Sequence, residues 1–283
     1  MPDISTNVVT DAIERQLETD QADLEVEELG FDPLILYYCE DFKVAENKIT
    51  IHQPVIQDFI TYGEDNIYSL ISPFVSNRTS LRLQLWNNGL DWNKVSDQWL
   101  FCSLLNQLNP KYSNIMFGDI DFSTFRCVEI KPDGKSEIVL YSQKHDIIID
   151  DKTRILMSKF IQHMFNQFPP EEEFTSSKQL KRDLINRDKQ ALIQQKNELK
   201  KTKGSKLLLY LSFCLNHPGF KYKKNELRDV GIFEFMDSVS RLNIYESTKA
   251  LYSGMYSGMC DLSKVNKNEF NFMRDPNEKS ENA

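Results

Sequence analysis

Apolar residues in the first 110 positions recur with two different periods, one typical of strands and one of helices. Short apolar runs over residues 34–38 and 48–52 predict strands. Apolar residues return every three or four positions in three further segments, which predict helices: 55–60, 67–71 and 99–108. A fourth helix is expected over 80–86, with Asn88-Gly89 as its C-terminal cap. Pro54 suits the first turn of a helix, whereas Pro73 and Pro110 are expected to end two helices. Trp86, Trp92 and Trp99 are expected to form the core of this helical cluster.

The pattern becomes strand-like from about residue 111 to residue 150. Apolar residues before and after Pro132-Asp133-Gly134 predict a β-hairpin, because this tripeptide has the composition of a tight turn. One more short strand is expected over residues 146–150. Asp151 or Thr153 can then cap a helix that ends before Pro169-Pro170.

Beyond residue 204 the apolar pattern is almost entirely helical. One apolar helix begins near Leu207 and ends at His217-Pro218-Gly219, a second begins at the cap Asn225, and a third covers about 245–251. The tetrapeptide Tyr-Ser-Gly-Met then occurs twice in tandem, over residues 252–259. Its glycines, Gly254 and Gly258, are expected to interrupt any helix, because each costs about 1 kcal/mol relative to Ala.

These changes of pattern predict an α+β fold, in which a mixed domain with short strands and a hairpin precedes a mainly helical C-terminal subdomain. The expected divisions are an acidic flexible arm (1–30), an α+β domain (31–170), a charged bridging helix (171–204), a helical subdomain (205–273) and a frayed tail (274–283). The charged residues of the bridging helix favour a solvated face. Their basic excess leaves contact with nucleic acid, an acidic partner or the chain's own acidic arm open.

Composition narrows the class of protein. Hydrophobic residues make up 40% of the chain and aromatic residues 11%, which is enough for a packed core. The net charge of −8 argues against a general nucleic-acid-binding protein. We expect a soluble intracellular protein, since no apolar run approaches the roughly 18 residues that span a bilayer and the N-terminus lacks the pattern of a secretory signal.

Few residues form a pattern typical of catalysis or metal binding. The five cysteines are too scattered for a zinc site or a disulfide framework and fit reduced thiols: Cys39, Cys102, Cys127, Cys214 and Cys260. Asp119 and Asp121 form a D-x-D pattern that a magnesium ion could use, together with the later Asp150. No phosphate-binding glycine loop accompanies them, so turn and cap roles are favoured. We expect no catalytic residue, cofactor or metal site.

The C-terminal aromatic and methionine residues are the candidate partner-binding residues: Tyr252, Met255, Tyr256, Met259, Phe270 and Phe272. Met adapts to varied surfaces, and Tyr combines apolar area with a polar tip. The alternative is that this segment packs on the helices before it. Both interpretations stay open, and one face could pack while the other binds.

Several motifs resemble uncharacterised proteins encoded in the tail gene clusters of bacteriophages and prophages of low-GC Gram-positive bacteria. The similarity runs from about residue 31 to 273. It rests on the segments 51–64 (Ile51-His-Gln-Pro54 to Gly63-Glu64) and 85–92 (Leu85-Trp86-Asn-Asn-Gly89-Leu-Asp-Trp92), on Phe117-Gly-Asp-Ile-Asp-Phe122 and His217-Pro-Gly-Phe-Lys-Tyr222, and on the Tyr-Ser-Gly-Met repeat. None of these motifs is tied to a catalytic role.

The resemblance implies a non-enzymatic tail-assembly protein of the host cytoplasm or the virion, with phage tail proteins as partners and no membrane. The leading hypothesis is a chaperone of the tape-measure protein, a long amphipathic helical protein whose apolar faces need cover before the tail tube forms. The alternative is a structural virion component of the baseplate, neck or connector. A third hypothesis is a nucleic-acid-processing enzyme that uses Asp119, Asp121 and Asp150. One departure is that many tail chaperones are smaller and made by a ribosomal frameshift. The oligomeric state stays open.

Overall fold

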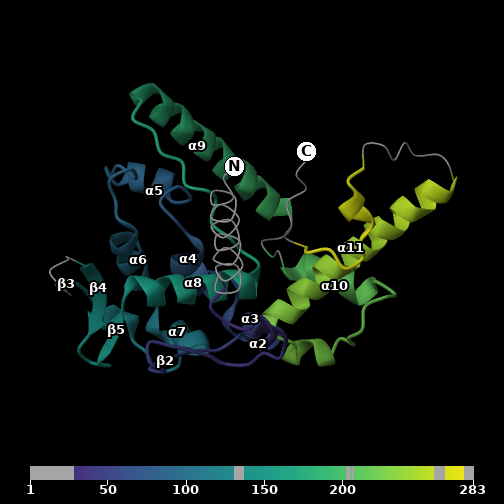
Figure 1. Cartoon of the computed structure of the whole chain (residues 1–283), viewed down its shortest axis with the longest axis horizontal. Helices are drawn as coiled ribbons and strands as arrows, with labels where there is room; N and C mark the ends of the chain where they lie inside the picture. The colour runs from purple at the N-terminus through teal and green to yellow at the C-terminus, as the bar shows by residue number, and fades with distance from the viewer. Residues whose placement is uncertain (1–28, 131–136, 202–204, 206, 258–264, 277–283) are drawn as a thin grey trace, which may run out of the picture.

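Helices predominate in the computed structural model, which describes residues 29–130, 137–201, 205, 207–257 and 265–276 (Figure 1). Two small antiparallel sheets, of two and three strands, accompany the helices. The α+β fold expected from the sequence is therefore confirmed. Most of the acidic arm, the turn of the expected hairpin and the last residues of the tail lie outside the described residues.

The first sheet pairs β1 (Phe42–Val44) with β2 (Ile49–Ile51), and its apolar side chains point into the core. β2 was expected from its apolar run. The ring of Phe42 stacks on Phe160 at 4.4 Å between centroids, which fixes the sheet against helix α8 (Asp151–Phe165).

Three further helices complete the main core around α8: α3 (Ile56–Tyr62), α4 (Glu64–Val75) and α7 (Pro110–Phe117). Gly63 ends α3 and directly precedes α4 with a φ of 89°, a conformation that favours glycine. The structure shows Asp150, rather than Asp151 or Thr153, as the cap of α8, because its carboxylate accepts a 2.7 Å hydrogen bond from the Thr153 N–H.

Two proline expectations were wrong. α4 continues past Pro73 to Val75, and the loss of one backbone donor is offset because the adjacent Phe74 packs between Phe101 and Phe117 in the core. Pro110 begins α7, where a missing N–H costs nothing, and Asn109 caps that helix. α7 lies in a region that was expected to be strand-like.

The run Leu34–Tyr37 forms the short helix α2, not the expected strand. The Asp32 carboxylate accepts a 2.9 Å hydrogen bond from the Leu34 N–H and so starts a helical turn. Leu36 points into the core, while Leu34 is more than half exposed. A five-residue apolar run carries no period by itself, so it does not distinguish a strand from a helical turn.

A smaller cluster of buried residues joins α5 (Arg82–Asn87) and α6 (Asp97–Leu105) to the long helix α9 (Lys178–Lys201). Its members are Leu85, Trp92, Leu100, Leu184 and Ile185. Only one of the three tryptophans belongs to it: Trp92 is fully buried, whereas Trp86 and Trp99 are 40% and 44% exposed. The expected tryptophan core is thus corrected to a single buried indole.

The second sheet has the order β3-β4-β5, with strands Arg126–Ile130, Glu137–Ser142 and Ile147–Ile149. The short 3₁₀ helix η1 (Phe122–Thr124) precedes it. The expected hairpin is confirmed as the antiparallel pair β3–β4, and β5 is the expected third strand. Buried Val139 and Leu140 place the sheet beside α6 and α8.

The C-terminal region contains α10 (Leu207–Asn216), the 3₁₀ helix η3 (Glu226–Asp229), the long helix α11 (Ile232–Ser257) and the 3₁₀ helix η5 (Lys267–Phe270). Asn225 precedes η3 rather than capping a long helix. α11 is one helix where two were expected, and it continues through Gly254. One interior glycine costs only about 1 kcal/mol, which the packing of a helix this long outweighs. Gly258 lies outside the described residues.

The C-terminal helices share the main core with the residues before them. Phe235 and Val239 of α11 and Cys214 of α10 belong to the same buried cluster as the strands and α8. Two backbone hydrogen bonds join the regions directly, from the Ile56 N–H to the Val230 carbonyl at 3.1 Å and from the Ile232 N–H to the Pro54 carbonyl at 3.0 Å. Across the part of the chain that the structure describes, no helix is both long and apolar enough to cross a membrane.

Candidate partner-binding surface

Helix α10 exposes large apolar side chains on most of its circumference. Leu207, Leu211 and Cys214, spaced at helical intervals, turn toward the core. The other apolar side chains of α10 face outward and are between 38% and 53% exposed: Leu208, Leu209, Tyr210, Phe213 and Leu215. We call these five residues the α10 patch. Exposed apolar residues are ordinary when they are single, whereas several on one helix indicate an interaction site.

A pocket of about 510 Å³ lies at the end of this patch, between α2, α11 and the loop after α10. His217 connects the two, because its ring contacts Phe213 of the patch at 5.6 Å and also lines the pocket. The apolar wall of the pocket is aromatic and aliphatic: Tyr37, Phe220, Leu242, Tyr245 and Phe272. The patch and the pocket therefore form one surface.

The charged groups of the pocket already have partners. The Tyr37 hydroxyl donates a hydrogen bond to the Asp237 carboxylate, and burial together with this bond raises the pKa of Tyr37 to about 12. Arg241 lies 3.4 Å from Asp237 and donates to the Arg274 carbonyl at 2.8 Å. Lys221 is held by Glu234 at 2.9 Å. A pocket whose charges are satisfied internally favours an apolar guest over an ionic one.

Of the candidate residues in the Tyr-Ser-Gly-Met segment, one packs against other aromatic rings and another is exposed. Tyr252 packs: its ring stacks on Phe272 and meets Phe270 edge-on, at 5.7 and 5.3 Å. Tyr256 is 81% exposed, while Met255 is half-buried. Met259 lies outside the described residues. Of the candidates, Phe272 alone lines the pocket, and their role in binding stays a prediction.

The segment after α11 is held against that helix by polar contacts as well as by rings. The Arg274 guanidinium donates to Thr248 and Ser247 of α11 and forms a 2.9 Å ion pair with Glu269. The buried Thr248 hydroxyl donates in turn to the Glu269 carbonyl at 3.0 Å. These contacts fix Phe270 and Phe272, and so they shape one wall of the pocket.

Sequence reasoning missed the α10 patch and most of the pocket. Residues 207–211 were interpreted as an ordinary apolar helix. A signal was present, because a ten-residue helix with apolar side chains on every face cannot bury all of them beside one core. Tyr37 and Tyr245 gave no such signal, since their meeting depends on how α2 and α11 pack.

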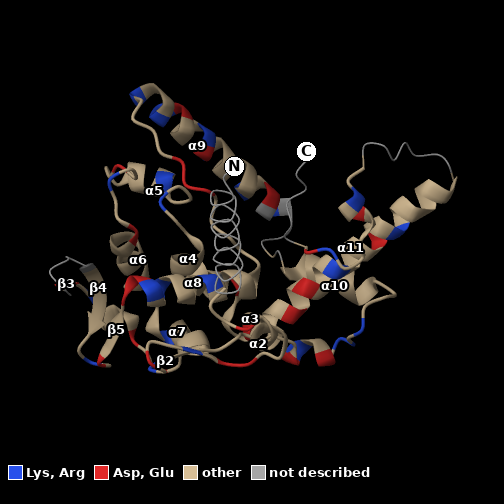
Figure 2. Ribbon diagram, in the orientation of Figure 1, with Lys and Arg blue, Asp and Glu red and all other residues tan. Residues whose placement is uncertain are grey.

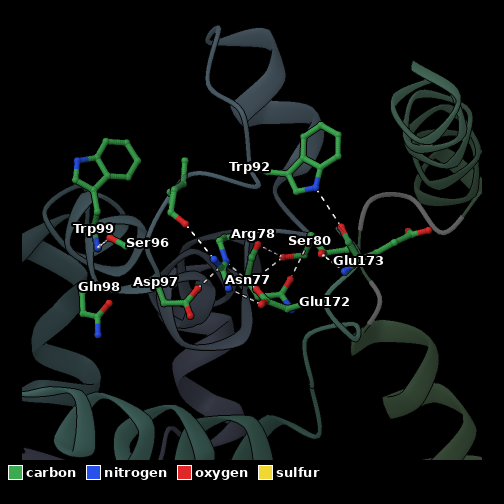
Figure 3. A network of polar contacts seen from close by, with 12 residues as sticks. Asn77, Arg78, Ser80, Trp92, Ser96, Asp97, Gln98, Trp99, Glu172 and Glu173 are labelled. Carbon is green, nitrogen blue, oxygen red and sulfur yellow. Dashed lines mark hydrogen bonds and ion pairs between the residues drawn. The ribbon is translucent and has the colours of Figure 1, made fainter. Parts of the chain in front are cut away.

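A second polar cluster fixes the segment before α9 to the loop between α4 and α5 (Figure 3). Arg78 lies between Asp97 and Glu172, at 3.0 and 2.5 Å. The Trp92 indole N–H donates to the Glu173 carbonyl at 3.1 Å.

A buried arginine holds α9 directly. The side chain of Arg82, 3% exposed, is bidentate to Asp188 and also reaches Glu173. These contacts are satisfied pairs that position α9.

Two of the three aspartates considered for metal binding serve as caps. The Asp121 carboxylate accepts a 2.6 Å hydrogen bond from the Ser123 hydroxyl, pairs with Lys144 at 3.1 Å and accepts from the Ser123 N–H, which together hold its pKa below the ordinary value. Asp119 is exposed and Asp150 caps α8. Within the described residues no three His, Cys, Asp or Glu side chains come together as a metal site. The turn and cap roles favoured from the sequence are therefore observed for Asp121 and Asp150.

Comparisons with family models, with curated proteins and with solved structures find no match for this chain.

Proposed function

We propose that this protein is a non-enzymatic phage tail-assembly factor that binds the tape-measure protein as a chaperone. The observation that carries the proposal is the α10 patch. A single helix presents three leucines and two aromatic side chains outward, beside an aromatic pocket. Such a surface fits the apolar face of an amphipathic helix, whose anchors recur every three or four residues. The resemblance to tail-cluster proteins supports a tape-measure helix as that partner.

The pocket supplies a place for one anchor side chain of the bound helix. Its volume of about 510 Å³ is more than one Leu, Met or Phe side chain fills, and aromatic and aliphatic residues form part of its lining. Anchors in well-packed pockets dominate the free energy of most protein interfaces. We therefore expect the pocket to contribute more to affinity than the exposed rim of the α10 patch.

The test is co-expression with the tape-measure protein encoded in the same tail gene cluster, followed by purification through a tag on one chain. Leu209→Glu places a charge in the centre of the α10 patch and should abolish co-purification. Ile148→Glu is the matched control, because Ile148 is also 53% exposed but lies on β5. Retention of the partner by both variants would contradict the proposed surface.

Two other outcomes would redirect the proposal. If the α10 patch joins two copies of this chain, light scattering should show a dimer that Leu209→Glu converts to a monomer. Recovery of the chain in stoichiometric amount from purified particles would favour the structural virion component. A gene position between the tail-tube and tape-measure genes would support the chaperone.

A further inference from the structure

The second half of α9 makes almost no contact with the rest of the described chain. Leu184 and Ile185, in the first half, are buried against α5. Every residue from 189 to 198 is exposed. Helices without packing are only marginally stable in water, so a solvated helical segment of this length calls for a partner.

An apolar stripe on α9 continues past the part that is covered. Leu192 lies two turns beyond Leu184 on the same face, and it is 41% exposed. Leu192 and Ala191 line a groove of about 600 Å³ between α9 and the start of α5. The groove therefore offers apolar surface along the uncovered face of α9.

The charge of α9 is strongly basic. The helix carries eight Lys and Arg residues and three Asp and Glu residues, a net charge of +5 (Figure 2). Within the described residues Lys189, Lys196 and Lys200 form no ion pair. Lys196 and Lys200 stand one turn apart, where like charges repel. An acidic occupant would remove this repulsion.

Residues 1–28 of the same chain have the complementary charge. They contain nine acidic residues and one arginine, a net charge of −8, so that all other residues together sum to zero. Their apolar positions Val9, Ile13 and Leu17 recur at intervals of four, as a partner of an apolar stripe requires. A tethered segment also acts at an effective concentration in the millimolar range.

The length of this segment sets how far it can reach. An extended chain spans about 3.3–3.6 Å per residue, so 28 residues reach roughly 90–100 Å. The whole of α9, at 1.5 Å per residue, is only about 36 Å long. The described chain begins next to α8, where Phe31 contacts Phe160 at 5.0 Å.

We propose that residues 1–28 bind in cis to the second half of α9. Their carboxylates pair with Lys189, Lys196 and Lys200, and Val9, Ile13 and Leu17 cover the apolar stripe at Ala191 and Leu192. The acidic segment thereby occupies the basic helix and excludes other acidic ligands from it. This inference does not depend on the tape-measure proposal, since it involves a different helix.

Hydrogen exchange of the full chain tests the contact. Deleting residues 1–28 should make the amides of 189–198 exchange roughly tenfold faster, as expected for loss of a local contact, while α8 stays protected. A synthetic peptide of residues 1–28 should restore the slow exchange. Unchanged exchange in 189–198 after the deletion would overturn the proposal.

Charge variants of the full chain provide a second test. Lys189→Glu, Lys196→Glu and Lys200→Glu combined should speed exchange in α9 as the deletion does. The matched control combines Lys43→Glu, Lys152→Glu and Lys224→Glu, which are exposed lysines on other elements. Equal effects of the two triple variants would overturn a specific contact.

Carbodiimide cross-linking of the unmodified chain separates binding in cis from binding to a second copy. In an equal mixture of light and heavy isotope-labelled chains, the carboxylates of 1–28 should link to lysines of α9 within one isotopic copy. The links should weaken in 0.5 M salt, about where the Debye length falls to a few ångström. Mixed-isotope links would overturn the cis arrangement.

Discussion

Cys102 and Cys214 show how burial changes a titratable side chain in this protein. Burial raises the pKa of Cys214 to about 11. Burial and a hydrogen bond with Cys127 raise the pKa of Cys102 to about 12. Both thiols lie in the main core, where the thiolate form would lose its hydration.

This burial predicts slow alkylation of both thiols in the folded protein. A thiol with a pKa of about 11 is roughly one part in a thousand thiolate at pH 8, and the thiolate is the reactive form. Iodoacetamide at pH 8 should therefore modify the exposed Cys127 first. Cys39 should follow it, because burial of its sulfur raises the pKa of Cys39 as well. Cys102 and Cys214 should react only after unfolding in denaturant, as peptide mass spectrometry would show. Equal labelling of all four in the native protein would contradict this prediction.

Arg82 is the most deeply buried charged side chain among the described residues, and it joins two segments about a hundred residues apart. Removing it leaves Asp188 and Glu173 without their main donor. Arg82→Ala should therefore lower the free energy of unfolding by about 2–3 kcal/mol. Chemical denaturation measures the change. Arg154→Ala is the matched control, because its pair with Asp151 is more exposed and should cost under about 1 kcal/mol.

The stability that the pair of Arg82 and Glu173 provides should depend on pH. The hydrogen bond from Arg82 lowers the pKa of Glu173 below its ordinary value. A lowered carboxyl pKa adds stability that is present above the unfolded pKa and is lost as the pH falls through the folded value. Stability of the wild type should therefore decline more steeply below about pH 4.5 than that of Arg82→Ala. Parallel declines would show that Arg82 does not act through Glu173.

At the scale of elements, Gly231 is the point where α11 meets the residues before α3. It bridges to Val55, and a Cβ placed on it would lie 2.6 Å from the side-chain oxygen of Gln53. Gln53 is buried and uses both ends of its amide: it donates to the Leu36 carbonyl and accepts from the Phe233 N–H, each at 3.0 Å. One glutamine thus ties α2 and α11 together.

Gly231→Ala should displace this glutamine and lower the free energy of unfolding by about 1–3 kcal/mol, the cost of leaving buried polar groups unpaired. Urea titration gives the value. The double variant Gly231→Ala/Gln53→Ala should lose less than the sum of the two single changes, because the clash and the hydrogen bonds share the same side chain. Additive losses would indicate that Gly231 acts through another neighbour.

The same scale shows which elements could be predicted. The fifteen residues of α8 and the alternation of the β3–β4 hairpin contain enough period to identify them from the sequence. The four residues of α2 do not, because so short an apolar run shows no period of its own. The extent of α11 was missed because a local glycine penalty is smaller than the packing of the whole helix.

At the scale of the whole molecule, the candidate surface was only partly accessible from sequence. Tyr252 and Phe270 were recognised as aromatic, but whether they pack depends on Arg274 folding back across α11. The pocket depends on the meeting of α2, α11 and the loop after α10. Contacts between residues some two hundred positions apart leave no periodic trace in a single sequence.

The arrangement of the core makes a prediction about folding. The C-terminal helices bury Cys214, Phe235 and Val239 in the same cluster as β1, β2 and α8. Without residues 29–201, these side chains would face water at a cost of about 25 cal/mol for each Å² of apolar area exposed. We therefore expect residues 205–283, produced alone, not to fold, although the sequence pattern suggested a separate helical subdomain.

Calorimetry, circular dichroism and NMR spectra of the fragment and the full chain provide the measurement. The full chain should unfold in one main transition that includes the C-terminal helices, because those helices share its core. The 205–283 fragment should show no cooperative transition and little dispersion of its amide resonances. A fragment that melts cooperatively and gives a dispersed spectrum would instead establish the C-terminal helices as an independent domain. The Ile56–Val230 and Pro54–Ile232 hydrogen bonds would then join two domains that each fold alone.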